Sequence, residues 1–491
     1  MAIDTETPQS AGWWLKVLST ELHNRRAGRV GTKRYVRNAV QPSRIDPGLQ
    51  LLSDYLAGDP PLREDIHSEW AAPFRQFLRV GRMNVAPKLV SSTTNRMGIR
   101  DFRTAAADDE LGDIEARNLM KRNDLKLKAR ELHDDMLGLG KAYTIVTPPG
   151  PKRTWSLITA ESPMECITAH DPATGETLAG LKMFRDEWDT TDFAYLFLPG
   201  KVMVAKCEVG SSTLFVGRQI FFLSDRWEWD ESLEQDVPND QVAMIRFRNK
   251  NGRSEIAGAL DTLDRINDKL FHEYWVGKLQ AFKQRALEMP EEEDDVDEAD
   301  DDDEPTPDDE DWAGIFTSAP DAMWKIPKGA KIWESTQTQL DGMLNSIKAE
   351  LMWLAFTESK PLHLVTPDAA NQSAEGASTQ KEEHSYEIED RRDRAEGSWG
   401  RTLSLAFLFQ NDTARAAVEQ IQPIWGPLER YSLQEKTTAA QAVKDVLPLE
   451  VIQTDILQYE PGDVVDRLRP LRATDLLFQP PGSPLPVNNA R

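Results

Sequence analysis

The sequence has 491 residues, of which 40% are hydrophobic and 29% are charged, and its formal net charge at pH 7 is -24. A chain of this length exceeds one ordinary core, so we expect roughly two to four substructures. The acidic balance argues against tight, non-specific binding to nucleic acid, the longest apolar stretches fall far short of the roughly 20 residues of a membrane span, and no signal peptide is visible at the N-terminus.

The first part of the chain, Trp13–Arg103, is predicted to be helical. A second short helix is expected at Leu51–Leu56, and a third amphipathic stretch at Trp70–Leu78. A longer helix is predicted from Asp113 to a glycine-rich stop at Leu139. The first helix has its apolar residues at helical spacing, at Trp14, Leu15, Leu18 and Leu22.

The region from Trp155 to Phe247 changes to short runs of β-type residues separated by turn residues. Residues 171–175 and 198–200 have the composition of hairpin connections. Together with an earlier run at Ala142–Thr147, these patterns predict an antiparallel β region. Its expected strands are Trp155–Ile158, Leu181–Arg185, Phe193–Leu198, Val202–Cys207, Thr213–Leu223 and Val242–Phe247.

Two long helices are predicted next, at Ser254–Ala286, with Ser254 as N-cap, and at Thr336–Phe356. Each has an apolar stripe at helical spacing, which indicates packing either within one chain or between chains. The residues expected to pack are Ile256, Leu260, Leu263, Leu340, Leu344, Ile347, Leu351 and Leu354.

A strongly acidic insert separates these two helices. Residues 288–311 contain 17 acidic side chains among 24, which leaves -7 for the rest of the chain (-24 + 17). Self-repulsion and the near absence of apolar residues predict that Glu291–Asp311 does not form a packed structure. Trp312–Trp333 is expected to be ordered again.

The last third is predicted to contain a loop, a long helix and shorter helices. Thr357–Gln372 has two prolines and is expected to be the loop, and the helix follows at Ser373–Phe409, with a kink at Gly397 and Gly400. Its charges are spaced four residues apart, as in Glu387 with Arg391 and Asp390 with Arg394, which is consistent with local pairs or with pairs between subunits. At least two shorter helices are expected within Ile421–Phe478, followed by a proline-rich tail.

Motifs for catalysis or for a cofactor are missing from the sequence. It has no phosphate-binding G-x-x-x-x-G-K-[ST] loop, no H-E-x-x-H and no G-x-S-x-G. The acidic insert lacks the fixed geometry of a metal-dependent nuclease and the glycine of an EF-hand. Two cysteines, Cys166 and Cys207, are too few for a disulfide framework and are expected in the core of a protein from a reducing cytoplasm. We therefore predict no catalytic residue, cofactor or metal.

The order of these elements resembles the portal proteins of long-tailed, double-stranded-DNA bacteriophages. Met97, Ile99 and Asp101 stand where this family has Leu, Val and Gly, and Gly426 stands where Asp is common. The strings that carry the resemblance are Leu51–Leu62, Asn84–Arg103, Gly138–Val146, Pro238–Leu270, Ser359–Gly376 and Trp425–Leu433.

The resemblance implies an α+β protein, mainly α with an antiparallel β region, that forms a ring of about twelve subunits. The implied parts are a wing (1–250), a first stem helix (251–286), a clip with the acidic insert (287–335), a second stem helix (336–356), a tunnel loop (357–372), a long kinked wing helix (373–412) and a crown-like C-terminal region (413–491).

The function that the resemblance implies is a DNA channel at one capsid vertex, used for packaging and ejection. Lys360 and His363 of the tunnel loop are the residues expected near the DNA. The implied partners are further copies of the chain, double-stranded DNA, the terminase large subunit, and the head–tail connector or adaptor, scaffold and major capsid proteins, with no membrane. The implied location is the virion, and the host cytoplasm during assembly. The alternative is another virion protein, such as a head–tail adaptor or minor capsid component.

Overall fold

A computed structural model describes residues 3–28, 47–61, 79–104, 106, 111–186, 188, 191–208, 227–281, 285–288, 331–334, 339–365 and 374–469. These residues form an α+β structure in which all paired strands are antiparallel. The predicted fold class is therefore confirmed. The predictions for Trp70–Leu78, Thr213–Leu223, the acidic insert and the proline-rich tail fall outside the described residues, as does most of Trp312–Trp333.

The first helix and the largest sheet form one hydrophobic core. α1 (Ala11–Ala27) begins at Ser10, whose Oγ accepts a hydrogen bond from the Trp13 amide (3.1 Å). The helix was predicted from the spacing of Leu15, Leu18 and Leu22, and these three residues are buried and pack with the sheet. The sheet runs in the order β4 (Cys166–His170), β5 (Thr177–Asp186), β6 (Thr191–Leu198), β7 (Lys201–Glu208) and β8 (Glu228–Trp229), with β9 (Gln235–Asp236) also pairing with β7.

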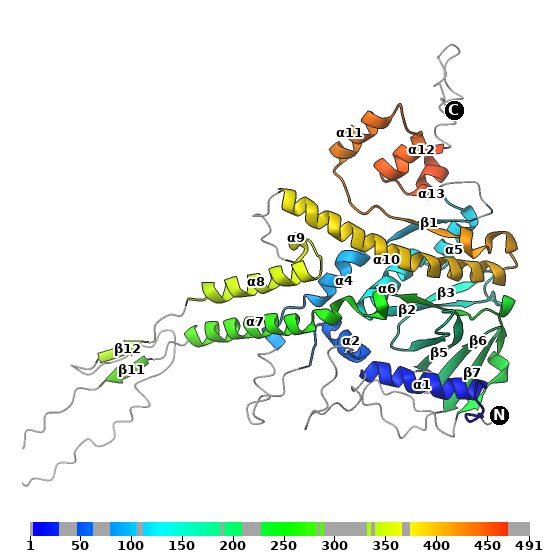
Figure 1. The fold of residues 1–491 in the computed structure, drawn as a ribbon, viewed down its shortest axis with the longest axis horizontal. Helices are drawn as coiled ribbons and strands as arrows, with labels where there is room; N and C mark the ends of the chain where they lie inside the picture. Colours follow the sequence, from blue (N-terminus) through cyan, green and yellow to red (C-terminus); the bar gives the residue numbers. More distant parts are fainter. Residues whose placement is uncertain are drawn as a thin grey trace, which may run out of the picture. The chain divides into compact units, whose positions relative to one another are not determined.

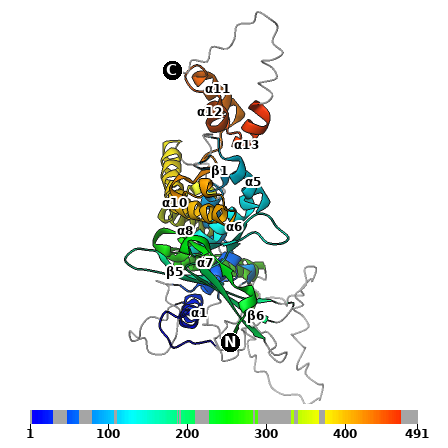
Figure 2. The same cartoon turned by 90° about the vertical axis from the view of Figure 1, so that its right-hand side faces the viewer.

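A second sheet lies between this core and the longest helix. It has the order β10 (Met244–Arg248), β2 (Lys141–Thr147) and β3 (Leu157–Glu161), and α10 (Ala374–Phe409) covers it (Figures 1 and 2). Trp399 of α10 is almost fully buried, and its Nε1 donates a hydrogen bond to Nε2 of His133 (3.1 Å). Burial lowers the pKa of His133 to about 3, so the ring is neutral and accepts this bond.

α10 contains both glycines at which a kink was predicted, Gly397 and Gly400. It is a single helix from Ala374 to Phe409. A Cβ on Gly400 would lie 3.2 Å from the carbonyl oxygen of Val418. This glycine therefore allows the following segment, with the short helices η7 (Thr413–Arg415) and η8 (Val418–Gln420), to lie close to α10.

The single helix predicted at Asp113–Leu139 is wrong, because the structure has two. α5 (Ile114–Arg122) and α6 (Leu125–Gly138) are separated by Asn123 and by Asp124, which has a left-handed backbone (φ 53°). The side-chain Nδ2 of Asn123 donates hydrogen bonds to the carbonyls of Leu119 and Ser156, and its Oδ1 accepts one from the backbone amide of Ile158. These bonds attach the break to β3, and the apolar periodicity of the sequence contains no sign of them.

The N-terminal and C-terminal parts of the chain meet in a small sheet. α2 (Leu49–Ala57) and α4 (Ala86–Thr94) precede β1 (Ile99–Arg103), which pairs with β13 (Gln422–Trp425). Beyond β13 are α11 (Leu433–Val443), α12 (Leu449–Val451), α13 (Pro461–Asp463) and the single-turn helices η9 (Ile452–Ile456) and η10 (Val464–Leu468). The shorter C-terminal helices were predicted, whereas the pairing of β1 with β13 was not.

The two predicted long helices are both present, with different ends. The first begins with a 3-10 turn, η4 (Glu255–Gly258), which Ser254 caps as predicted, and continues as α7 (Leu260–Ala281). It does not reach Ala286, because residues 285–288 form β11 (Arg285–Glu288) and pair with β12 (Lys331–Glu334). The second is α8 (Asp341–Thr357), and the predicted loop after it contains a short helix, α9 (Leu362–Val365).

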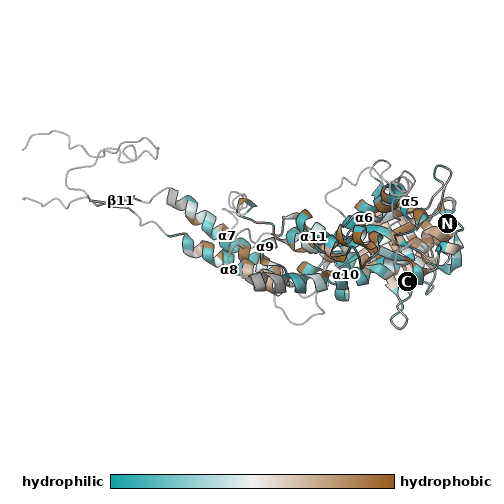
Figure 3. Cartoon of the chain, turned by 90° about the horizontal axis from the view of Figure 1, so that it is seen from above, coloured by the Kyte–Doolittle hydropathy of each residue, from teal (hydrophilic) through white to brown (hydrophobic). Residues whose placement is uncertain are grey.

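The chain divides into two compact units. The smaller unit, Asp268–Ile347, contains the end of α7, the β11–β12 hairpin and the start of α8, and all other residues belong to the larger unit. Lys269 Nζ donates to Ser346 Oγ (2.8 Å) in the smaller unit, and Arg265 pairs with Glu350 (3.0 Å) in the larger one. α7 and α8 therefore lie side by side in each, and Figure 3 shows both hydrophilic and hydrophobic residues on the two helices. None of the described helices is long and apolar enough to cross a membrane.

Candidate functional site

Lys360, predicted to lie near DNA, is buried in a network of charged side chains. Its Nζ donates hydrogen bonds to Oγ1 of Thr93 and to Oε2 of Glu387, both at 2.8 Å, and lies 3.5 Å from Oε2 of Glu255. Thr93 belongs to α4, Glu255 to the turn before α7 and Glu387 to α10. In this structure the ammonium group joins three elements. Contact between Lys360 and DNA stays a prediction.

Arg391 closes the network from the other side. It lies 2.8 Å from Glu255 and 3.3 Å from Glu387, so two cations alternate with two carboxylates. The pair between Glu387 and Arg391 forms within α10, as does the pair between Asp390 and Arg394 (2.8 Å). These contacts agree with the local interpretation of the charge pattern, and Arg391 also connects α10 with the start of α7.

The network shifts the pKa values of two carboxylates in opposite directions. Burial alone would raise the pKa of Glu387, but His384, Lys360 and Arg391 together lower it to about 2. Glu358 lies near the same charges without an ion-pair partner among the described residues. Burial, reinforced by Glu255 and Glu387 and only partly offset by Lys360, raises the pKa of Glu358 to about 7.

Replacing Glu358 with glutamine is expected to stabilise the protein at alkaline pH. The pKa of Glu358 rises from an ordinary 4.5 to about 7 on folding, so the folded state binds more protons than the unfolded state in this window. The free energy of unfolding therefore falls as pH rises through it, by about 3 kcal/mol. Glutamine carries no charge at any pH, so E358Q should be more stable than the wild type by up to about 3 kcal/mol at about pH 8 and equally stable at about pH 4.5.

Urea unfolding at the two pH values measures this difference. Glu176 is exposed, so E176Q makes the same chemical change on the surface and provides the matched control. If E358Q and E176Q have the same stability relative to the wild type at both pH values, Glu358 is ionised in the folded protein and the expected destabilisation is absent.

His363, the second residue predicted to lie near DNA, is exposed and lines a small cavity of about 170 Å³. Burial and the neighbouring Lys381, Arg96 and His384 lower its pKa, so the imidazole is mostly neutral at pH 7. Lys360 and His363 therefore lie in different surroundings, one inside a network and the other on a surface with other cations. A contact between His363 and DNA stays a prediction as well.

The residues predicted to pack the two long helices differ in burial. Six of them are at most 6% exposed, namely Ile256, Leu260, Leu263, Ile347, Leu351 and Leu354. Leu340 is half-buried, and Leu344 is 42% exposed, so it packs little within this chain. Packing between subunits stays a prediction for these residues.

α8 also carries an exposed hydrophobic surface that the sequence analysis missed. Met352, Trp353 and Phe356 are 53%, 63% and 73% exposed, and we call these three residues the α8 apolar face. Trp353 and Phe356 contact each other edge to face, with ring centroids 6.4 Å apart. The signal was available, because the run from Leu351 to Phe356 is apolar around the whole helix and one buried stripe accounts for only part of it.

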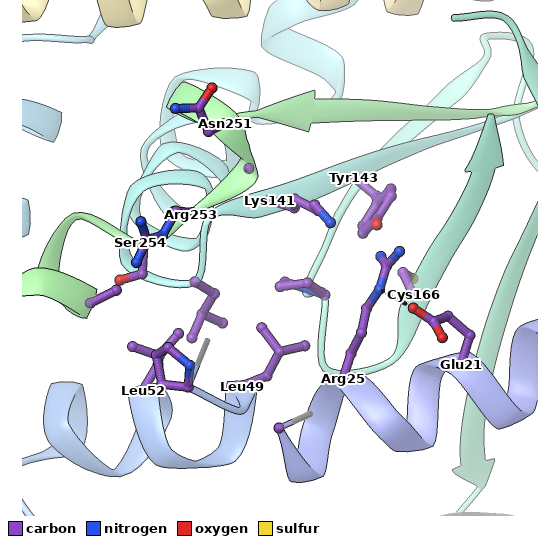
Figure 4. Close-up of a pocket in the computed structure, with 16 residues that line it drawn as sticks. Glu21, Arg25, Leu49, Leu52, Lys141, Tyr143, Cys166, Asn251, Arg253 and Ser254 are labelled. Atoms are coloured by element: carbon purple, nitrogen blue, oxygen red, sulfur yellow. Dashed lines mark hydrogen bonds and ion pairs between the residues drawn. The ribbon is translucent and has the colours of Figure 1, made fainter. Parts of the chain in front are cut away.

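A cavity of about 240 Å³ lies between α1, α2, β2 and the segment before α7 (Figure 4). Arg25, Lys141 and Arg253 line it together with a single acidic residue, Glu21, which pairs with Arg25 (3.2 Å). Burial and the nearby arginines lower the pKa of Lys141 to about 8. In the part of the chain that the structure describes, no three His, Cys, Asp or Glu side chains are grouped as they would be to hold a metal ion.

Comparisons with known proteins identify similar chains. Residues 43–456 match the model of the family described as "Phage portal protein, SPP1 Gp6-like". A chain from the "Neck of native GTA particle computed with C12 symmetry" is 11% identical, with a TM-score of 0.40, and the alignment covers 80% of this chain and 94% of that one. A chain from the "Virion of native gene transfer agent (GTA) particle" is also 11% identical, with a TM-score of 0.41 and coverage of 90% and 98%. The curated proteins include no match.

Proposed function

The chain belongs to the SPP1 Gp6-like family of phage portal proteins, and we propose that about twelve copies assemble into a ring that forms the DNA channel at one vertex of the capsid. DNA would pass through this channel during packaging and again during ejection. The task involves no covalent chemistry. The protein would hold a pore of constant diameter while a polyanion moves through it.

The α8 apolar face is the observation that best supports assembly. Three large hydrophobic side chains, each more than half exposed, lie together on one helix. A contiguous exposed patch of this kind is typical of a surface that binds another protein. A ring of identical subunits needs an interface between two different surfaces of neighbouring copies. We infer that the α8 apolar face is one of them.

Charge also agrees with a channel function. Even without the acidic insert, the formal net charge of the remaining residues is -7. Channel walls that are neutral or acidic would attract the DNA phosphates only weakly, so DNA would move with little friction. In this proposal residues 357–372 form the tunnel loop. His363 is its exposed candidate for a DNA contact, whereas Lys360 would first have to leave Thr93, Glu255 and Glu387.

The remaining parts of the proposal follow the family. Residues 1–250 and 373–412 would form the wing, 251–286 and 336–356 the stem, 287–335 the clip and 413–491 the crown. The clip would meet the terminase large subunit during packaging and the head–tail connector or adaptor afterwards. Scaffold and major capsid proteins would surround the ring in the virion, after assembly in the host cytoplasm.

Replacing Trp353 and Phe356 with serine is expected to prevent ring assembly. A ring of about twelve chains of 55.5 kDa would have a mass of about 670 kDa (12 × 55.5). Loss of two large hydrophobic contacts at each interface should leave mostly monomers, because every interface of the ring is repeated. Mass photometry and sedimentation velocity measure the distribution directly.

The matched control removes two exposed hydrophobic side chains elsewhere. Trp188 is 98% exposed and Leu127 is 60% exposed, so W188S/L127S makes a similar chemical change outside α8. This control should assemble like the wild type. A wild-type protein that stays monomeric at all salt and protein concentrations would contradict the proposal and favour a head–tail adaptor or a minor capsid component.

A further inference from the structure

A large cavity with a strongly basic lining lies between the N-terminal part of the chain and the C-terminal helices. Its volume is about 890 Å³, and α4, β1, α6 and the segment from Gly426 to Glu460 form its walls. We call it the basic cavity. Its charged and polar lining residues are Lys88, Ser91, Ser92, Asn95, Arg96, Arg100, Lys126, Arg130, Arg430, Lys436, Gln458 and Glu460.

The charge of this lining is opposite to that of the whole protein. Seven of the lining side chains are cationic and only Glu460 is anionic, in a chain with a formal net charge of -24. Glu460 pairs with Lys126 at 2.5 Å. Six positive charges are therefore not balanced within the lining. Mutual repulsion among these charges favours the binding of an anion.

Two arginines are held in place by the C-terminal segment. Arg96 donates a hydrogen bond to the carbonyl of Leu428 (3.1 Å), and Arg100 donates to the carbonyls of Gln458 and Tyr459 (both 3.2 Å). Carbonyl groups orient a guanidinium without neutralising it. Burial lowers the pKa of both arginines, partly offset by Glu429 for Arg96 and by Glu460 and Asp455 for Arg100. The fold thus keeps two partly desolvated charges in fixed positions.

Four other cations in the lining have no carboxylate at ion-pair distance among the described residues. These are Lys88 of α4, Arg130 of α6, and Arg430 and Lys436 of the C-terminal segment. The small cavity beside His363 shares Arg96 and Arg430 with the basic cavity and adds Lys381, with Glu429 as its one acidic lining residue. Positive charge therefore continues from the basic cavity toward the proposed tunnel loop.

We propose that the basic cavity binds the sugar–phosphate backbone of a nucleic acid. Its cations come from four separate segments around a space much larger than one phosphate group, so they suit several phosphates in a row. The guanidinium groups match phosphate in geometry, and Ser91 and Asn95 add neutral donors of the kind that contact backbone oxygens. The inference rests on the proposed function, which brings DNA to the assembled protein.

The acidic balance of the chain does not exclude this site. The net negative charge of the chain opposes a general attraction to DNA. A local group of cations then provides one defined contact on a surface that otherwise repels DNA. We infer that the basic cavity holds DNA at one position of the ring subunit and leaves the rest of the surface free of it.

Neutralising three of these cations tests the proposal. K88Q/R430Q/K436Q removes side chains that donate to no described protein group, so folding and assembly should be preserved. The assembled full-length protein is titrated with a short fluorescent DNA duplex at several salt concentrations. We expect the variant to bind at least about tenfold more weakly at low salt, and the slope of log K against log salt to fall by about 2–3, since each phosphate contact contributes about 0.9.

A control variant with the same change in charge separates binding at the basic cavity from the general effect of protein charge on DNA binding. Lys121, Lys152 and Lys250 are exposed and do not line the basic cavity, so K121Q/K152Q/K250Q should leave the slope unchanged. Equal effects of the two triple variants would overturn the proposal. A second result would also overturn it. If an acidic peptide with the sequence of residues 288–311 binds the wild-type protein at this cavity more tightly than the DNA duplex does, the natural ligand is a protein.

Two further readouts complete the test. Displacement of the duplex by inorganic phosphate at equal total charge would mean that single anions bind as well as a backbone does, which also contradicts the proposal. Mass photometry of the same samples reports ring formation independently. If rings form but the salt dependence does not change as expected, only the proposed DNA binding by the basic cavity is refuted. If the wild type forms no rings, the proposed function is refuted.

Discussion

Replacing Lys360 with alanine is expected to lower the free energy of unfolding by about 3–5 kcal/mol, as is usual when one member of a buried ion pair is removed. The Lys360 side chain is 2% exposed, and the Glu255 side chain is 7% exposed. Without the ammonium group, Arg391 would be the only lysine or arginine among the described residues that still pairs with Glu255 and Glu387. Two buried carboxylates would then share one positive charge.

Urea unfolding of K360A measures this loss, with K121A as the control because Lys121 is exposed on a helix. The pH dependence gives a second readout. The pKa of Glu387 is about 2 in the folded protein and ordinarily 4.5, so its stabilisation is present above about pH 4.5 and is lost as pH falls toward 2. In K360A this pKa should rise toward its ordinary value, so the stability of the variant should fall less than that of the wild type as pH falls from about 4.5 to 2.

The same experiment separates a structural role for Lys360 from a role in DNA contact. The double variant K360M/E387Q should recover part of the stability lost in K360M alone, since it removes one unpaired carboxylate together with its cation. A loss below about 1 kcal/mol in K360A would contradict the buried network. It would mean that the ammonium group can reach solvent, as a DNA contact requires.

Replacing Arg117 with methionine is expected to have an effect of similar size, about 3–5 kcal/mol. Arg117 of α5 lies 2.6 Å from Asp101 of β1, and the side chains are 5% and 1% exposed. Arg117 also donates to the carbonyl of Leu111, and Gly462 lies against its side chain. Removing it would leave Asp101 unpaired and open a gap between α5, β1 and the C-terminal helices.

The loss in R117M should depend on pH. Burial raises the pKa of Asp101, and Arg117 only partly offsets this effect. The pKa should rise further without Arg117, so the destabilisation should be larger at about pH 8 than at about pH 4, where the carboxyl group is protonated. Urea unfolding at both pH values measures this, with exposed Lys121 on the same helix replaced by methionine as the control.

The double variant D101G/R117M provides the matching test of cause. Glycine, the residue that the resemblance to portal proteins implies at the position of Asp101, has no charge, so it should remove the unpaired carboxylate and recover part of the stability. If D101G/R117M is no more stable than R117M, the loss comes from packing around the arginine and not from the buried carboxylate. The pair also gives a physical reason for this departure from the family, because Asp101 has a dedicated partner in this chain.

Patterns confined to one element predicted much of the fold. The spacing of Leu15, Leu18 and Leu22 predicted the buried face of α1, and the β-type runs predicted β2, β6 and β7 within one or two residues. The Ser254 cap was predicted because a serine hydroxyl satisfies a free amide at a helix start without help from the rest of the chain. β4 was missed, since Cys166–His170 is short and has little alternation.

Contacts between distant segments could not be predicted in this way. The pairing of β1 with β13 joins residues about 320 positions apart, and the break between α5 and α6 depends on bonds from Asn123 to β3. Lys360 was identified as a notable cation from its position in a loop. Its actual partners belong to three other elements that no local pattern connects to it.

The sequence by itself determined where most of the helices and strands form, the acidic character of the chain and, through co-linear strings, its resemblance to portal proteins, because these depend on neighbouring residues and on composition. The tertiary structure alone decided which charges from different elements meet. It buries Lys360 between Thr93, Glu255 and Glu387, and it gathers Lys88, Arg96, Arg130 and Arg430 around one cavity. The free energy of a charge depends on its burial and on its partners within a few ångströms, and these are set by folding and not by distance along the chain.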